Sequence, residues 1–243
     1  GVSYLGKVPV AGAVRAVVEG TVLGGYRYTD YKTVDDPNGQ VSQFEIFGAD
    51  EFEVVEALAG AQATNLARDW VNTPAKDKSP AALAEMMSDA ATEVGLSAEI
   101  WDEGRIIDER LGGLLGVAAG SARPPRVVIL GYEPNESRGH LGLVGKGITF
   151  DTGGLSIKSA KSMEDMKTDM SGAAVVASAT IAVAELGLPV TITVVIPMTD
   201  NAVGGDATRP GDVLRPVAGP TIEVLNTDAE GRLILADGLG VVR

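Results

Sequence analysis

RVVILGY, residues 126–132, carries four consecutive apolar residues at its centre, and this pattern predicts a buried strand. Two more short apolar runs follow, at residues 141–144 and 190–196. The alanine-rich stretch between them, residues 172–186, is typical of a helix. Buried strands that alternate with helices indicate an α/β fold, with a mixed, mostly parallel sheet and helices on both faces.

The segment before residue 126 extends this pattern toward the N-terminus. A helix is predicted over residues 79–94, with Ser79 as its N-cap, a proline in its first turn and a glycine after its end. A short strand is expected at residues 97–101. Residues 106–114 are predicted to be helical, and the glycine pair at 112–113 is expected to loosen the end of that helix.

The first fifty residues are less regular. A small-residue helix is predicted at 10–23 and a strand at 41–47, with a turn at 35–39, where the sequence is Asp-Asp-Pro-Asn-Gly. Residues 49–70 carry apolar side chains at helical spacing, and Pro74 would stop that helix. A long helix between an irregular part and a regular part predicts a connector between two domains.

Composition limits the classes of protein and of site. The 243 residues are 45% hydrophobic, which suffices for one large or two smaller domains. A net charge of −13 argues against nucleic-acid binding and against an anionic membrane surface. The chain has no cysteine, which excludes disulfides and thiolate metal sites and fits a reducing compartment such as the cytoplasm. No run of 18 apolar residues occurs, so no membrane span is expected.

Several polar residues stand at strand ends and in glycine-rich loops. Taken singly, each has an ordinary explanation. A lysine at a strand end is usually solvated, an aspartate before two glycines shapes a turn, an aspartate before a helix caps it, and an Asp-x-Glu pair forms the wet face of a strand. In chain order they are Lys146, Asp151, Lys158, Asp169, Asp228, Glu230 and Arg232.

Together, the four acids predict a metal site. Buried carboxylates without a partner are costly, so such groups must be paired or must bind a metal. The chain has one histidine, His140, which we expect to be structural or exposed, so oxygen donors that suit Mn²⁺, Mg²⁺ or Zn²⁺ dominate. If the segment NTDAEGR (226–232) is extended, Asp228, Glu230 and Arg232 lie on one face of it.

These motifs resemble the leucine aminopeptidase family, the two-metal cytosol aminopeptidases. The resemblance covers about residues 50 to 243, in the family's order and spacing. The matching segments are WVNTP (70–74), GGLLGVAAGSARPPR (112–126), VGKGITFDTGG (144–154), Lys158, the K-x-D-M of 167–170, and NTDAEGR followed by L-x-L-A-D (226–237). The first fifty residues resemble the end of the family's N-terminal domain more weakly.

The resemblance implies two divalent ions, Mn²⁺ or Zn²⁺. One ion would be held by Lys146 and by Asp151, Asp169 and Glu230. The other would be held by Asp151 and Glu230, which bridge the two ions, and by Asp228 through its side chain and its carbonyl. Two ions about 3.5–4 Å apart can lower the pKa of a shared water. A lysine ligand must be neutral, and adjacent cations would depress its pKa.

The resemblance also implies catalytic roles for two cations. Lys158 would stabilise the negative charge that develops in the reaction. Arg232 would hold a bicarbonate that acts as general base. Without the resemblance, Lys158 would be interpreted as a surface lysine, and Arg232 as the partner of Asp237 or Glu223. Two further residues keep two interpretations each: Asn226 contacts substrate or shapes a turn, and Met166 lines the pocket for the first side chain or belongs to the core.

The expected organisation follows from the same resemblance. Residues 1–50 would be the C-terminal part of a smaller N-terminal α/β domain, residues 51–71 a connecting helix, and residues 72–243 a catalytic domain that is incomplete at its C-terminus. Gly1 is not an initiator methionine and the chain stops in an apolar segment, so we expect a piece of a longer protein. Peptide substrates and a homohexamer are the expected partners.

Three functions are weighed. The leading one is a metal-dependent exopeptidase that removes N-terminal residues, with leucine-like residues preferred. The second is an architectural DNA-binding role, as in some family members, against which the acidic net charge argues. The third is a different two-metal hydrolase such as a phosphatase, which the lysine ligand and the NTDAEGR segment disfavour.

Overall fold

The computed structural model describes residues 12–33 and 43–243, which fall into two compact units, Gly1–Asn65 and Leu66–Arg243. In the first unit, the two predicted helices are confirmed as α1 (Ala13–Gly24) and the start of α2 (Glu51–Asn72). α2 continues into the second unit, where it ends before Pro74. The turn predicted at 35–39 lies outside the described residues.

The strand predicted at residues 41–47 is wrong in its described part. Residues 43–47 join no sheet within the part of the chain that the structure describes. Phe44 and Phe47 are 52% and 87% exposed. Alternating apolar residues form a strand only where a neighbouring strand accepts their backbone hydrogen bonds, so the pattern alone was insufficient.

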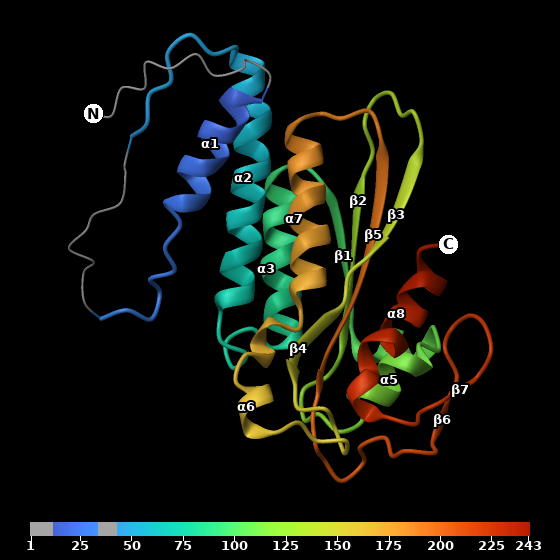
Figure 1. The fold of residues 1–243 in the computed structure, drawn as a ribbon. Coiled ribbons are helices and arrows are strands. Elements are labelled where there is room, and N and C mark those ends of the chain that lie inside the picture. The colour runs from blue at the N-terminus through green and yellow to red at the C-terminus, as the bar shows by residue number, and fades with distance from the viewer. Residues whose placement is uncertain (1–11, 34–42) are drawn as a thin grey trace. The chain divides into compact units, whose positions relative to one another are not determined.

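The second unit is built on a five-stranded mixed sheet (Figure 1). The strands are β1 (Ser97–Trp101), β2 (Arg126–Tyr132), β3 (His140–Val144), β4 (Gly147–Asp151) and β5 (Thr191–Asn201). β2 lies between β1 and β5 and pairs antiparallel with both. On the other side of β5, β3 pairs in parallel with the first half of β5 and β4 with its second half.

Every strand predicted in this unit is confirmed, and β5 is longer than expected. The prediction ended at residue 196, where the β-branched run stops; Pro197 follows, and proline is rarely found inside a sheet. In the structure, Pro197 lies between the residues that pair with β3, which end at Val195, and those that pair with β4, which begin at Met198. The proline therefore stands where the neighbouring strand changes, and β5 continues past it to Asn201.

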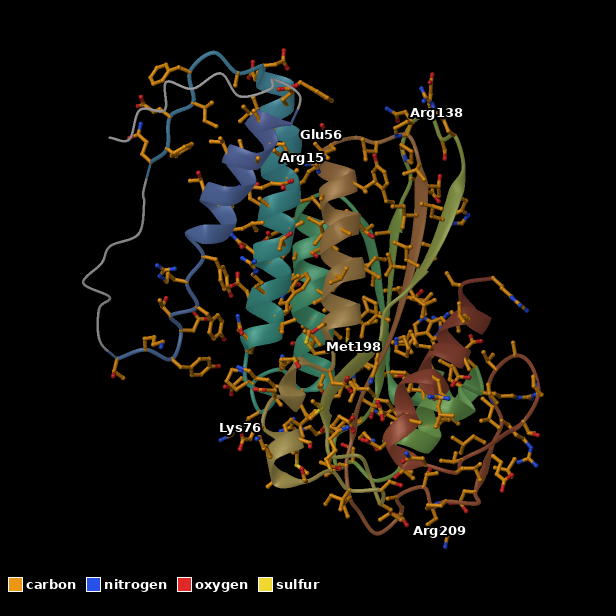
Figure 2. All side chains as sticks on the ribbon, viewed as in Figure 1. Arg15, Glu56, Lys76, Arg138, Met198 and Arg209 are labelled. Carbon is orange, nitrogen blue, oxygen red and sulfur yellow. The ribbon has the colours of Figure 1, made fainter. Side chains whose placement is uncertain are left out.

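Helices cover both faces of the sheet, as the sequence predicts (Figure 1). On one face, α3 (Pro80–Glu93) and α7 (Ser171–Glu185) pack against alternate residues of β2 and β5, including Val128 and Met198. Figure 2 labels Met198. On the other face, α5 (Gly112–Ala118) and α8 (Glu230–Val241) pack against Val127. A two-stranded ribbon, β6 (Val213–Leu214) and β7 (Ile222–Glu223), lies outside the main sheet.

The capping of α3 agrees with its sequence. The Ser79 side chain accepts a hydrogen bond from the backbone N–H of Ala82, Pro80 is the first helical residue, and Gly95 follows the helix with a φ of 83°. Positive φ is the conformation that glycine adopts without steric cost, so Gly95 ends the helix for the predicted reason.

The single helix predicted at 106–114 is wrong, because two helices occupy this region. α4 (Glu103–Asp108) ends before Arg110, whose φ is 61°, and α5 begins at the glycine pair 112–113. A Cβ on Gly112 would lie 2.1 Å from the Arg215 carbonyl oxygen, so a neighbouring backbone requires glycine there. The glycine pair therefore begins α5, where the helix closely approaches the backbone at Arg215, and does not loosen the end of a helix.

Of the described helices, none combines the length and the apolar character needed to cross a membrane.

Candidate active site

The acids predicted from the sequence meet where β4 and β5 end. Asp151 is the last residue of β4 and pairs with Asn201, the last residue of β5. Lys146 lies in the two-residue break between β3 and β4, which run in the same direction along β5, and Glu230 is the first residue of α8. Because β4 and β5 are parallel, their carboxyl ends share one edge of the sheet, where α/β proteins commonly bind ligands.

Lys146 joins two of the predicted ligands. Its Nζ lies 2.8 and 2.9 Å from the two carboxylate oxygens of Asp169 and 2.6 Å from Glu230 Oε1. Burial lowers the pKa of Lys146, but the hydrogen bonds to Asp169 and Glu230 outweigh burial and raise it above its ordinary value. Burial raises the pKa of Asp169 to about 6, although its hydrogen bond to Lys146 opposes that rise.

Asp169 does not cap a helix, which was its ordinary interpretation. It follows a short 3₁₀ helix, η1 (Met166–Thr168), and the N-cap of α7 is Met170, which makes no side-chain cap. The Asp169 carboxylate turns to Lys146 instead. Its Oδ1 atom accepts the hydrogen bond from Lys146 Nζ, and its buried Oδ2 atom is ion-paired with the same nitrogen at 2.8 Å.

Lys158 joins the other two acids and is not a surface lysine. Its Nζ lies 3.0 Å from Asp151 Oδ2 and makes a very short hydrogen bond to Asp228 Oδ1, while its side chain is 15% exposed. Burial lowers the pKa of Lys158, but the hydrogen bonds to Asp228 and Asp151 reverse that effect and raise it. The lysine follows the glycine-rich turn 152–157 and precedes the short helix α6 (Ala160–Met163).

Three carboxylates are close enough to hold one cation. One oxygen from each of Asp151, Asp228 and Glu230 lies within 4.8 Å of the others. Asp151 and Glu230 are each 2% exposed, and Asp228 is half-buried. With Asp169, the four carboxylates outnumber the two lysines, so the cluster has a formal charge of 2 − 4 = −2. Hard oxygen donors with excess negative charge fit divalent cations.

Glycines bring the backbone close to this cluster. Gly153 and Gly154 have φ values of 84° and 62°. A Cβ on Gly153 would lie 2.5 Å from the Ser156 carbonyl oxygen and 2.9 Å from Asp228 Oδ1. A Cβ on Gly231 would lie 2.9 Å from the end of the Lys146 side chain. The turn after β4 and the start of α8 therefore need glycine for the acids to converge.

The extended conformation considered for NTDAEGR is wrong, because the segment is helical. Residues Thr227–Ala229 form a 3₁₀ helix, η2, and α8 follows from Glu230. The Asn226 side chain accepts a hydrogen bond from the Asp228 backbone N–H at 2.9 Å, so Asn226 shapes the turn, as one of its two interpretations had it. α8 buries Glu230, Leu233, Ile234 and Asp237, a three-to-four residue spacing that the alternation of charges concealed.

Arg232 is exposed on the first turn of α8 and, within residues 12–33 and 43–243, has no ion pair or side-chain hydrogen bond. The partner suggested by the ordinary interpretation, Asp237, is engaged elsewhere. Its carboxylate accepts hydrogen bonds from the backbone N–H groups of Leu114 (2.8 Å) and Val217 (2.7 Å). The structure therefore brings together six of the seven predicted residues, whereas the Arg232 side chain is exposed and makes no contact of this kind with the other six.

Sequence reasoning missed Asn201. The two N–H groups of its side-chain nitrogen are shared among three acceptors, Asp151 Oδ1 (2.8 Å), the Thr227 carbonyl (3.0 Å) and, at the longest distance, Glu230 Oε2 (3.4 Å). The signal was the polar Thr-Asp-Asn sequence at 199–201, which a strand prediction ending at residue 196 excluded. His140 is exposed, as predicted, and its ring contacts the Thr193 hydroxyl at 2.8 Å.

Comparison with known proteins gives one consistent answer. Residues 65–243 match the model of the cytosol aminopeptidase family, catalytic domain. A probable cytosol aminopeptidase of Leifsonia xyli subsp. xyli is 48% identical in an alignment that covers 92% of this chain and 46% of that protein. One of Streptomyces avermitilis is 45% identical in an alignment that covers 96% of this chain and 48% of that protein. The chain spans about half the length of the curated relatives it matches.

Solved structures agree with these relatives. The bottromycin maturation enzyme BotP in complex with Mn has a TM-score of 0.85 and 42% sequence identity, over 98% of this chain and 50% of that one. The cytosol aminopeptidase of Coxiella burnetii has a TM-score of 0.80 and 31% identity, over 93% of this chain and 48% of that one. The likeness therefore extends to both the sequence and the three-dimensional fold.

Proposed function

The chain belongs to the cytosol aminopeptidase family, and on that premise we propose that it carries the metal site of an aminopeptidase that hydrolyses the first peptide bond of peptides. The observation that carries the proposal is the convergence of Asp151, Asp228 and Glu230, whose ligand oxygens lie within 4.8 Å of one another. A cluster of buried acids is costly unless cations compensate it. An exposed, fully hydrated acidic patch would need no such compensation.

Two divalent ions would occupy this cluster. Lys146, Asp151, Asp169 and Glu230 would hold one, and Asp151, Asp228 and Glu230 the other. Mn²⁺ and Zn²⁺ are the proposed ions, and the related BotP structure contains Mn. When bound, such ions polarise a substrate carbonyl and lower the pKa of a water molecule. Asp169 Oδ2 is buried and lies 2.8 Å from Nζ of Lys146, the other group proposed to hold only this ion, which supports its assignment as a ligand.

Lys158 would stabilise negative charge on the substrate. Its raised pKa keeps the ammonium group charged at neutral pH, and its contacts with Asp151 and Asp228 hold it beside the metal ligands. A fixed positive charge in a partly buried site stabilises an oxyanion more than the same charge in water. The aminopeptidase reaction creates such an oxyanion when the peptide carbonyl is attacked.

Arg232 would hold a bicarbonate as the general base. The guanidinium is exposed and makes no ion pair or hydrogen bond in the described part of the chain, so it has hydrogen-bond donors available for an anion. Met166, which is partly exposed in η1, would line the pocket for the first side chain of the peptide, with leucine-like residues preferred. We extend the proposal to a cytoplasmic homohexamer by family membership alone.

A direct assay tests this function. Purified full-length protein is stripped of metal, resupplied with Mn²⁺ or Zn²⁺, and assayed for release of p-nitroaniline from leucine p-nitroanilide. We expect activity that depends on the added metal and is absent in Asp151→Asn. An N-terminally acetylated leucine substrate serves as the control, because an exopeptidase needs a free amine. Metal-independent hydrolysis, or equal hydrolysis of the acetylated substrate, would contradict the proposal.

A further inference from the structure

Asn201 lies behind the acid cluster, and its side-chain amide reaches three separate segments. The residue is 4% exposed. Its Nδ2 atom lies 2.8 Å from Asp151 Oδ1 at the end of β4, 3.0 Å from the Thr227 carbonyl in η2, and 3.4 Å from Glu230 Oε2 at the start of α8. One buried amide thus connects all the segments that supply Asp151, Asp228 and Glu230.

Asn201 contacts one oxygen of each of two carboxylates in the cluster. Asp151 Oδ1 accepts hydrogen bonds from Asn201 and from the Gly153 backbone N–H (2.8 Å), so Oδ2 is the atom that faces Lys158 at 3.0 Å. Glu230 turns Oε2 to Asn201, while Oε1 lies 2.6 Å from Lys146. In both acids, one oxygen faces the amide and the other faces a lysine of the cluster.

The identity of the residue matters as well as its position. An amide nitrogen offers two N–H donors, whereas an aspartate at the same place would offer none and would add a fifth negative charge beside Asp151. A Cβ on Gly154 would lie 3.0 Å from Asn201 Oδ1, so the amide is also packed against the turn that follows β4. Asparagine therefore supplies donors without charge at the point where three segments converge.

We propose that Asn201 is a positioning residue for Asp151 and Glu230, and that it sets the affinity of the site for divalent cations. This inference rests on the proposed function, because it takes these two acids as ligands. Groups that hydrogen-bond to metal ligands fix the orientation of those ligands, and their loss typically weakens metal binding by about 10- to 100-fold. We expect a loss in this range when the Asn201 amide is removed.

The neighbouring residue gives a matched control. Asp200 is also buried, at 8% exposure, but strand alternation turns its side chain to the opposite face of β5. There its carboxylate accepts hydrogen bonds from the hydroxyls of Thr149 and Ser121. Asp200→Asn therefore alters a buried polar side chain of the same size, one residue away, without removing a contact to the acid cluster.

The test is a calorimetric titration of metal-free, full-length protein with MnCl₂, together with thermal unfolding of the metal-free proteins. The proteins compared are the parent, Asn201→Ala, Asn201→Ser and Asp200→Asn, and the serine variant serves if the alanine variant does not fold. We expect the Asn201 variants to bind Mn²⁺ about 10- to 100-fold more weakly than the parent. Asp200→Asn should bind within about twofold of the parent, because its contacts lie outside the cluster.

The outcomes separate this inference from its premise. If the parent binds Mn²⁺ and both Asn201 variants bind it equally well, the positioning role is wrong and the proposed function stands. If the parent binds no Mn²⁺, the proposed function fails and the inference fails with it. If Asp200→Asn loses as much affinity as the Asn201 variants, general loss of packing explains the effect, and the role assigned to Asn201 is overturned.

Discussion

Lys78 provides a test of the physical reasoning that is independent of the active site. Its side chain is completely buried, and its Nζ donates hydrogen bonds to the carbonyls of Trp70 and Val71, both at 2.8 Å, in the last turn of α2. The sulfur of Met170 lies 3.4 Å away. Burial lowers the pKa of Lys78 to about 7 from its ordinary 10.5, and the charge of Lys167 adds to this shift.

The sign and size of the effect follow from proton linkage. Between pH 7 and pH 10.5 the unfolded chain protonates this lysine while the folded chain does not, so stability rises with pH across that window and is constant below it. Each unit of pKa difference corresponds to about 1.4 kcal/mol. From pH 7 to pH 10, the contribution of Lys78 to the free energy of unfolding should therefore become more favourable by about 3–4 kcal/mol.

The perturbation is Lys78→Met, which keeps a long apolar side chain and removes the titrating group. Urea unfolding of the metal-free parent and variant at five pH values from 6 to 10 gives the difference in free energy between them. Loss of the two hydrogen bonds shifts that difference by the same amount at every pH. The slope of the difference against pH therefore reports the titration of Lys78 alone. Between pH 7 and pH 10, we expect the free energy of unfolding of the parent to rise by about 3–4 kcal/mol relative to that of the variant.

The control is Lys76→Met, in the same turn. Lys76 is exposed, and Figure 2 shows its side chain directed outward. The free energy of unfolding of this variant should differ from that of the parent by a constant amount at every pH, because the other titrating groups cancel in the difference. If the difference in free energy of unfolding between the parent and Lys78→Met is also constant between pH 7 and pH 10, burial does not depress the pKa of Lys78 and the reasoning is refuted.

Three further predictions concern the site. Lys158→Ala should retain bound metal, measured by elemental analysis, and lose about 10²- to 10³-fold in kcat, because the charge that stabilises the oxyanion is absent; undiminished kcat would contradict its role. Gly153→Ala should lower the free energy of unfolding by about 1–3 kcal/mol in urea titration, because its φ of 84° and the 2.5 Å approach to Ser156 exclude a side chain; unchanged stability would contradict this strain. Removal of metal with a chelator should lower the unfolding temperature, since an ion at 100 times its Kd contributes about 2.7 kcal/mol; an unchanged temperature would argue against a site in the folded state.

The sequence by itself determined most of the strands and helices of the second unit, although it did not predict β4 or the two separate helices α4 and α5. The apolar strands from 97 to 196 and the helices that alternate with them follow from local periodicity and capping, as Ser79 and Gly95 illustrate. Residue type and surroundings were enough to single out Asp151, Asp169, Asp228 and Glu230, because buried carboxylates in apolar surroundings need compensating cations. The resemblance to the aminopeptidase family then added Lys146 and Lys158.

Only the tertiary structure decided how these groups meet. The charges of NTDAEGR suggested an extended segment, but contacts of Leu233 and Ile234 with the core favour a helix that places Glu230 at its start. The partners of Asn201 lie 26 to 50 residues away along the chain, so no local pattern could reveal them. Short-range preferences fix each element, whereas the hydrogen bonds that orient a carboxylate depend on which distant segments pack against it.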